Sequence, residues 1–152
     1  MQLRQVSLAD PAVAPLLDWL ADAYRAWYGA PDHVVPEEFE PPEGAFVVLA
    51  DDDGRTVAGG GFRPVEPGVC EVKRVWTAPD HRRRGHASTV LGELERLASD
   101  RGYRAIRLET GPRQPEAEAM YRARGYRHTP EHAHYPSALA FEKPLTPPPR
   151  AR

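Results

Sequence analysis

The segment from Cys70 to Ala98 constrains the fold of this chain more than any other. Its first part, Glu71 to Thr77, is rich in β-branched and aromatic residues and predicts a strand, which the turn residues at 78–80 end. After Gly85 the apolar residues recur at steps of three and four, as on one face of a helix. An alternating segment at 104–110 follows. The resulting strand–helix–strand unit predicts two parallel strands.

The remaining segments predict a mixed α/β sheet. A strand is expected at 2–6, a helix from Asp10 to Tyr28, a hairpin of strands at 45–50 and 56–63, a helix from Pro115, and a final strand pair at 126–132 and 138–143. Three consecutive glycines, 59–61, indicate a bulge or a close backbone neighbour. We therefore expect one α/β domain over residues 1–145 and a flexible, proline-rich tail at 146–152.

The turn before the predicted helix has the features of an anion site. The first N–H groups of a helix lack partners inside it and carry the positive end of its dipole. Gly85 and Ala87 keep side chains away from that backbone, and Arg82, Arg83 and Arg84 add positive charge. The pattern favours a phosphate or a diphosphate, although an ordinary turn with solvated arginines would look the same.

A family resemblance rests on this turn and on a second motif. Arg82-x-x-Gly85-x-Ala87 resembles the R/Q-x-x-G-x-G/A signature of the GNAT superfamily of N-acetyltransferases. A second motif is similar to the family's N-x-x-A-x-x-L-Y-x-x-x-G-F and consists of Gln114, Ala117, Met120, Tyr121, Gly125 and Tyr126. Gln114 departs from the usual Asn. The resemblance covers about residues 45–145 and implies a mixed, mostly antiparallel sheet that is splayed between two parallel strands and flanked by helices.

The resemblance implies that acetyl-CoA is the co-substrate. Its pyrophosphate would meet the turn, and its pantetheine arm would run along the strand before the turn, like an added strand. The cofactor-binding residues expected on this basis are Val75, Trp76, Thr77, Arg82, Arg83, Arg84, Gly85, His86, Ala87, Ser88, Gln114 and Tyr121.

Two residues are candidates for proton transfer. By resemblance Tyr121 is the acid that assists the departing thiolate; alternatively it is only a buried aromatic at helical spacing from Ala117. Glu71 is the candidate base, because a carboxylate can collect the proton of an amine whose own pKa is about 10.4. The alternative is that Glu71 pairs with Lys73 or Arg104 on a solvent-exposed face.

The expected acceptor is a small-molecule or peptide amine. By family layout, the residues that would border it are Tyr24, Trp27, Tyr28, Glu71 and His134. Three closely spaced histidines, at 128, 132 and 134, lack the cysteine or carboxylate that would complete a recognisable metal pattern, so we expect no metal. The single cysteine, Cys70, excludes an internal disulfide.

Charge and hydropathy argue against several classes of protein. Residues 1–70 carry 12 acidic against 4 basic side chains, whereas residues 71–152 carry 16 basic against 10 acidic, for a net charge of −2. This balance argues against nucleic-acid binding, and no apolar run or leader pattern suggests a membrane or a secreted protein. We expect a cytoplasmic monomer or homodimer that acetylates a primary amine by direct attack in a ternary complex. Transfer of another acyl group and a non-catalytic CoA sensor are the alternatives.

Overall fold

Seven strands form one mixed sheet in the computed structural model, which describes residues 1–29, 35–110, 115–134 and 138–146. Their order is β1-β2-β3-β4-β5-β7-β6, and among the described strands only β4 and β5 are parallel neighbours. The bounds are β1 Gln2–Gln5, β2 Ala45–Ala50, β3 Thr56–Glu66, β4 Val69–Thr77, β5 Ala105–Thr110, β6 Arg127–His128 and β7 Leu139–Pro144. The predicted fold class, with its pair of parallel strands, is confirmed.

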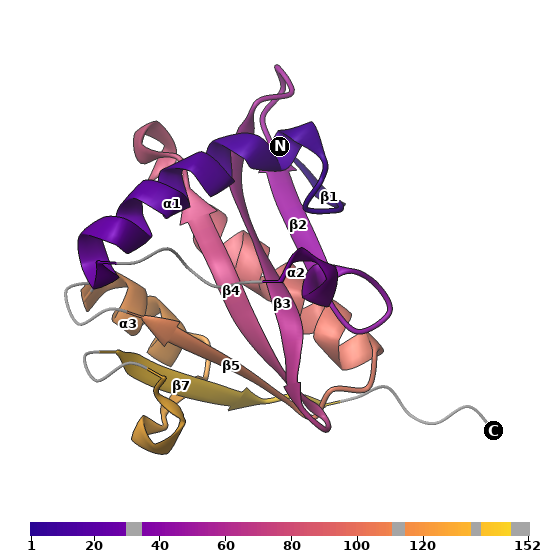
Figure 1. The fold of residues 1–152 in the computed structure, drawn as a ribbon, viewed down its shortest axis with the longest axis vertical. Coiled ribbons are helices and arrows are strands. Elements are labelled where there is room, and N and C mark those ends of the chain that lie inside the picture. The colour runs from indigo at the N-terminus through magenta and orange to yellow at the C-terminus, as the bar shows by residue number, and fades with distance from the viewer. Residues whose placement is uncertain (30–34, 111–114, 135–137, 147–152) are drawn as a thin grey trace.

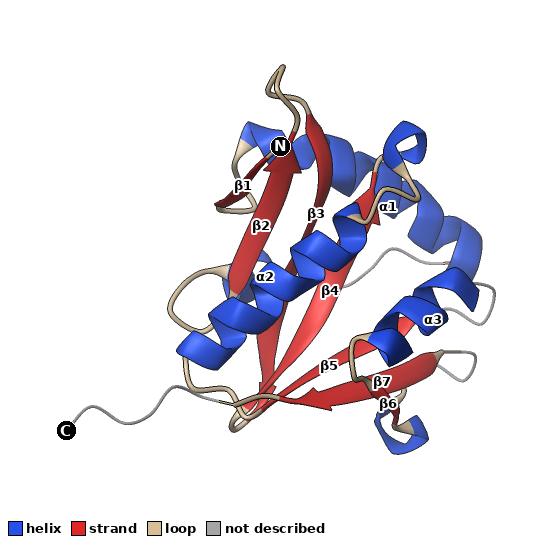
Figure 2. Cartoon of the chain, turned by 180° about the vertical axis from the view of Figure 1, so that it is seen from behind, coloured by secondary structure: helices blue, strands red, loops and turns tan. Residues whose placement is uncertain are grey.

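Helices cover both faces of the sheet. Helix α1, Ala14–Tyr28, lies across one face, and helices α2, His86–Asp100, and α3, Pro115–Ala123, cover the other (Figures 1 and 2). Short 3-10 turns stand at η1 Pro11–Val13, η2 Pro36–Phe39, η3 Pro79–His81 and η4 Pro130–His132. No helix in the described ranges is long and apolar enough to cross a bilayer.

Each face of the sheet has its own apolar core. Under α2 and α3, the core includes Phe62, Leu91, Leu94, Ile106 and Phe141, all fully buried. Under α1, a smaller core is formed by Val13, Leu16, Leu20, Phe39, Phe46, Val48, Trp76 and Ala78.

The parallel strands pair only at their beginnings. Val69 is opposite Ala105, Cys70 opposite Ile106 and Glu71 opposite Arg107, and no later pair joins β4 to β5 among the described residues. Beyond Glu71 the two strands diverge, as Figure 1 shows. On its other side β4 stays paired with β3 as far as Thr77. In the described structure the backbone of β4 after Glu71 therefore has one edge without a neighbouring strand.

A bulge interrupts β4 directly after this point. Arg74 has φ 61°, and the pairing with β3 jumps from Gly61–Lys73 to Gly59–Trp76. The extra residue shifts the alternation of side chains. As a result, Val72 and Val75 both face the α2 core, whereas Trp76 packs in the α1 core.

The three glycines of β3 are explained by close neighbours, as predicted. A Cβ on Gly60 would lie 3.2 Å from Cα of bulged Val75, and one on Gly61 would lie 2.5 Å from the Phe46 ring and 2.6 Å from the Ala45 carbonyl oxygen. A side chain at either position would collide with the backbone of a neighbouring strand, which cannot shift without disturbing the sheet.

Two predicted elements differ from the structure. The expected strand at 126–132 is reduced to Arg127–His128, because Pro130 has no N–H for a strand ladder and instead opens η4. The predicted first helix begins as the 3-10 turn η1, with Asp10 accepting a hydrogen bond from the backbone N–H of Ala12 at 2.8 Å. Except for Thr146, the predicted tail lies outside the described residues, so it stays a prediction.

The glycine contacts predict a graded loss of stability. We expect Gly61→Ala to lower the free energy of unfolding by about 2 kcal/mol, because the new methyl group overpacks against backbone. Gly60→Ala serves as the comparison and should cost less, since its contacts are longer. Urea unfolding of both variants measures this; a Gly61→Ala protein as stable as the wild type would contradict it.

Candidate functional site

The turn that precedes α2 presents backbone donors and positive charge together. Gly85, directly before α2, has φ 78°, and among the described residues no side chain caps that helix end and no atom lies within 4 Å of a Cβ placed on Gly85. Arg82, Arg83 and Arg84 are exposed around it. The described part of this turn is an open, basic helix N-terminus, and its binding to a diphosphate stays a prediction.

Two of the arginines lie against neighbouring helices. The Arg82 guanidinium lies over the ring of Trp19 in α1, 5.3 Å from its centroid, and Arg83 pairs with Glu116 in α3 at 3.2 Å. The turn therefore sits between α1 and α3. Burial, His81 and Arg84 hold the pKa of His86, in the first turn of α2, below its usual range, which disfavours a positive charge on this ring.

A buried carboxylate in α2, Glu95, is linked to the first turn of the same helix through Arg124. Glu95 in α2 accepts hydrogen bonds from Arg124 at 2.9 and 3.1 Å, from Lys143 at 2.8 Å and from the Tyr126 hydroxyl at 3.0 Å. Burial alone would raise the pKa of Glu95, but the bonds from Arg124 and Lys143 outweigh it and lower that pKa. Arg124 also donates to the Ser88 hydroxyl at 3.0 Å. The network joins the first and third turns of α2 to the segment after α3 and to β7.

Sequence reasoning missed Glu95, although a signal for it existed. Glu95 falls at position i+4 from Leu91, on the apolar face of the helix, where an unpaired carboxylate would be costly. A charge on such a face implies cationic partners from another element, but the sequence does not say which.

Tyr121 projects from α3 into the larger core. It is 8% exposed, and its ring packs 6.0 Å from that of Tyr126 and 6.1 Å from that of Phe141, centroid to centroid. Its hydroxyl makes no hydrogen bond to the described part of the chain, and burial raises the pKa of Tyr121 to about 12. The side chain is thus a buried aromatic, as one interpretation held, and at neutral pH it is a protonated phenol that can donate a hydrogen bond.

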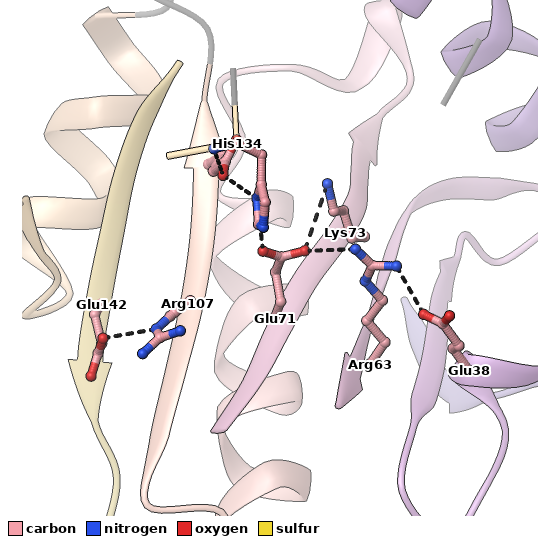
Figure 3. A network of polar contacts seen from close by, with 8 residues as sticks. Glu38, Arg63, Glu71, Lys73, Arg107, His134 and Glu142 are labelled. Carbon is pink, nitrogen blue, oxygen red and sulfur yellow. Dashed lines mark hydrogen bonds and ion pairs between the residues drawn. The ribbon is translucent and has the colours of Figure 1, made fainter. Parts of the chain in front are cut away.

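Glu71 is buried at the point where β4 and β5 separate. It is 2% exposed, and its Oε1 lies 3.2 Å from Arg63 and 3.7 Å from Lys73 (Figure 3). Arg63 also pairs with Glu38 at 2.8 Å. The alternative of a solvent-exposed Glu71 paired with Arg104 is therefore wrong: Lys73 is a partner, but the carboxylate is buried.

His134 meets Glu71 from the loop that precedes β7. Its Nδ1 lies 3.5 Å from Glu71 Oε2 and forms a hydrogen bond with Oε1 of Glu109 in β5. The same Glu109 oxygen accepts the backbone N–H of His134 at 2.7 Å. Sequence reasoning named His134 and Glu71 but missed Glu109, whose contact with His134 spans 25 residues.

The expectation that no metal binds stays a prediction. Glu71, Glu109 and His134 offer ligand atoms within 4.8 Å of one another. However, Glu71 already contacts the cationic side chains of Arg63 and Lys73, which oppose a bound cation.

The other predicted residues are only partly brought together. Val75, Trp76 and Thr77 lie on β4 beyond the split, with Trp76 buried toward α1. Tyr24 is half-buried at the margin of the α1 core. Trp27 and Tyr28 end α1, but their side chains are not among those described, and Gln114 lies outside the described residues. Cys70 is buried, which raises the pKa of its thiol to about 12, so it is no nucleophile.

A family model and related sequences show which proteins this chain resembles. The model of the acetyltransferase (GNAT) family matches residues 13–126. An uncharacterised N-acetyltransferase from Schizosaccharomyces pombe is 26% identical over 100 residues, which cover 65% of this chain and 61% of that protein. The chain thus matches less than two thirds of the length of this relative.

Solved structures extend the similarity to nearly the whole chain. A Klebsiella pneumoniae protein assigned as an acyl-CoA N-acyltransferase superposes with a TM-score of 0.78 at 28% identity, over 95% of this chain and 97% of the other. A phosphinothricin acetyltransferase from Sinorhizobium meliloti, crystallised with acetyl-CoA, has a TM-score of 0.71 at 17% identity, over 95% and 88% of the two chains. At that identity the likeness concerns the fold alone.

The Glu95 network predicts a matched pair of stability effects. We expect Glu95→Gln to lower the free energy of unfolding at pH 7 by about 2 kcal/mol, because it leaves half-buried Arg124 and Lys143 without their counter-charge. Because the folded-state pKa is lowered, the stabilisation is present above about pH 4.5 and is lost as the pH falls through the folded-state value.

The control is Glu93→Gln on the same helix. Glu93 pairs with exposed Arg96, so its loss should change stability by less than about 0.5 kcal/mol. Urea unfolding at pH 7 and pH 3.5 measures both variants. Equal losses at pH 7 would contradict a special role of Glu95.

Proposed function

Because this chain belongs to the acetyltransferase (GNAT) family, we propose that it transfers the acetyl group of acetyl-CoA directly to a primary amine in a ternary complex. The observation that carries the proposal is the split between β4 and β5, which starts at Glu71 and has the open α2 N-terminus near its far end. A small molecule or a peptide can supply the amine.

The turn before α2 would hold the pyrophosphate. Its uncapped N–H groups and the guanidinium groups of Arg82, Arg83 and Arg84 supply donors and positive charge, and Gly85 leaves the backbone open to close approach. His86, Ala87 and Ser88 continue this surface along the first turn of the helix. The hydrogen bond from Arg124 holds the Ser88 hydroxyl in place.

The free edge of β4 would take the pantetheine arm. Val75, Trp76 and Thr77 lie beyond the last pair with β5, so their backbone on that side is open to an added strand-like partner. A backbone N–H on this edge is also placed to polarise the thioester carbonyl.

Tyr121 would assist the leaving thiolate as a hydrogen-bond donor. Its pKa of about 12 lies well above the value of about 8.5 for a thiol, so complete proton transfer from the phenol is uphill. A hydrogen bond from the phenol still stabilises the negative charge that develops on sulfur, and water can supply the proton afterwards.

The anion site predicts a binding defect without unfolding. We expect Gly85→Glu to abolish acetyl-CoA binding in calorimetry, because a carboxylate would then stand among the pyrophosphate donors. The matched control is Gly102→Glu: both glycines have positive φ and open space around a Cβ, but Gly102 follows the opposite end of α2. Unchanged affinity in a folded Gly85→Glu protein would remove the turn from the site.

The proposed activity is tested by release of free thiol from acetyl-CoA in the presence of amines, amino acids and short peptides. We expect amine-dependent release that falls about 100-fold or more in Tyr121→Phe with acetyl-CoA binding retained, because one hydrogen-bond donor to the negative charge that develops on sulfur is lost. Tyr103→Phe is the control, since that hydroxyl bonds the Glu43 carbonyl near the C-terminal end of α2. Tight acetyl-CoA binding without release for any acceptor would instead favour a sensor.

A further inference from the structure

We propose that His134, rather than Glu71, accepts the proton of the acceptor ammonium, with Glu109 as the residue that positions its ring. The inference rests on the proposed acetyl transfer and assigns its base. It starts from the contacts of one imidazole nitrogen, Nδ1, with two carboxylates, buried Glu71 and partly buried Glu109, one from each of the two diverging strands.

The contacts determine which ring nitrogen is free. Ionised carboxylates only accept hydrogen bonds, so the Nδ1 that faces Glu109 and Glu71 must carry the hydrogen. In the neutral ring the lone pair then resides on Nε2. Within the described part of the chain Nε2 makes no hydrogen bond, and the side chain of His134 is 49% exposed. Nε2 is therefore available to a proton from a bound amine and can pass it on to water.

Glu109 fixes both the ring and its backbone. One oxygen, Oε1, accepts the backbone N–H of His134 and its ring Nδ1–H. The Glu109 side chain is 10% exposed, and its second oxygen is buried without a hydrogen-bond partner in the described structure. When the neutral His134 ring takes up a proton, it becomes a positively charged partner for the Glu109 carboxylate.

Glu71 is less suited to meet the amine directly. It is 2% exposed, and its two oxygens face Arg63 and Lys73 on one side and His134 on the other (Figure 3). An ammonium group could reach these oxygens only by displacing one of those side chains. The negative charge of Glu71 is already opposed by Arg63 and Lys73, so we assign it a supporting role toward the ring.

The proton balance is simple. His134 Nε2 takes one proton from the ammonium group, which frees the lone pair of the amine. The amine nitrogen forms its bond to the acetyl carbon as the carbon–sulfur bond breaks. After the attack, the amine nitrogen loses a second proton, which is transferred to the CoA thiolate directly or through water. His134 then releases the first proton to solvent. One proton is released for each amide and thiol formed.

The kinetic test uses thiol release with acetyl-CoA and the amine that the wild-type protein acetylates fastest in the panel above. His134→Asn keeps a donor that can face Glu109 but removes the base. We expect kcat/KM to fall about 100-fold or more, with acetyl-CoA binding unchanged. In His134→Gly, added imidazole should restore part of the rate, an effect that a structural role would not produce.

His132→Asn is the matched control. His132 lies 3.6 Å from Glu142 and 3.9 Å from Glu131, so it has carboxylate neighbours but no contact with Glu71 or Glu109 in the described structure. It should keep the wild-type rate. A His134→Asn protein as active as His132→Asn would overturn the proposal while leaving the transferase activity intact. If the wild-type protein acetylates no amine, the proposed function fails, and the base assignment fails with it.

A second measurement does not depend on the acceptor. Nitrogen-15 NMR of the imidazole distinguishes the two neutral tautomers, and we expect the Nδ1–H form for His134. In Glu109→Ala the population should move toward the Nε2–H form, as expected of a positioning residue. A neutral His134 protonated on Nε2 in the wild-type protein would overturn the assignment, because that nitrogen could not accept a proton.

Discussion

The site depends on how few residues join the two parallel strands. Three pairs tie β4 to β5, and the last of them includes Glu71. Up to that pair the sheet is continuous and its cores can close on both faces. Beyond it the strands separate, and no further pair joins β4 to β5 among the described residues. Glu71, Glu109 and His134 meet where the strands begin to separate, and the helix start proposed for the pyrophosphate follows the end of β4.

The bulge in β4 makes the same strand serve two purposes. If Arg74 took a regular strand conformation, strict alternation from Val72 would turn Val75 toward α1 and Trp76 toward α2. With the bulge, apolar side chains stay against both cores while the strand bends away from its parallel neighbour. Gly60 lies opposite the bulge with almost no room for a side chain, so the glycines of β3 and the shape of the site are linked.

The sequence predicts local structure well in this protein, that is, the strands, helices and turns. The helix start at Gly85, the strand before it and the parallel β5 all follow from periodicity and turn residues between 70 and 110. Contacts between distant segments were not accessible: Glu109 meets His134 across a loop, and Glu95 meets Lys143 across 48 residues. Whether Glu71 is buried stayed open for a related reason, since its neighbours Arg63 and His134 come from other elements. The shortened β6 was a local error, because Pro130 alone should have ended that strand.

Pro130 also limits the length of the strand at one edge of the sheet. The turn η4 limits β6 to two residues, and at the opposite edge β1 has only four. Exposed strand edges are templates for pairing with other chains, and short edges that carry charge present little of that template. β6 consists of Arg127 and His128, and β1 carries Arg4 among polar neighbours. A seven-stranded sheet that is open at both sides is thereby protected against edge-to-edge aggregation.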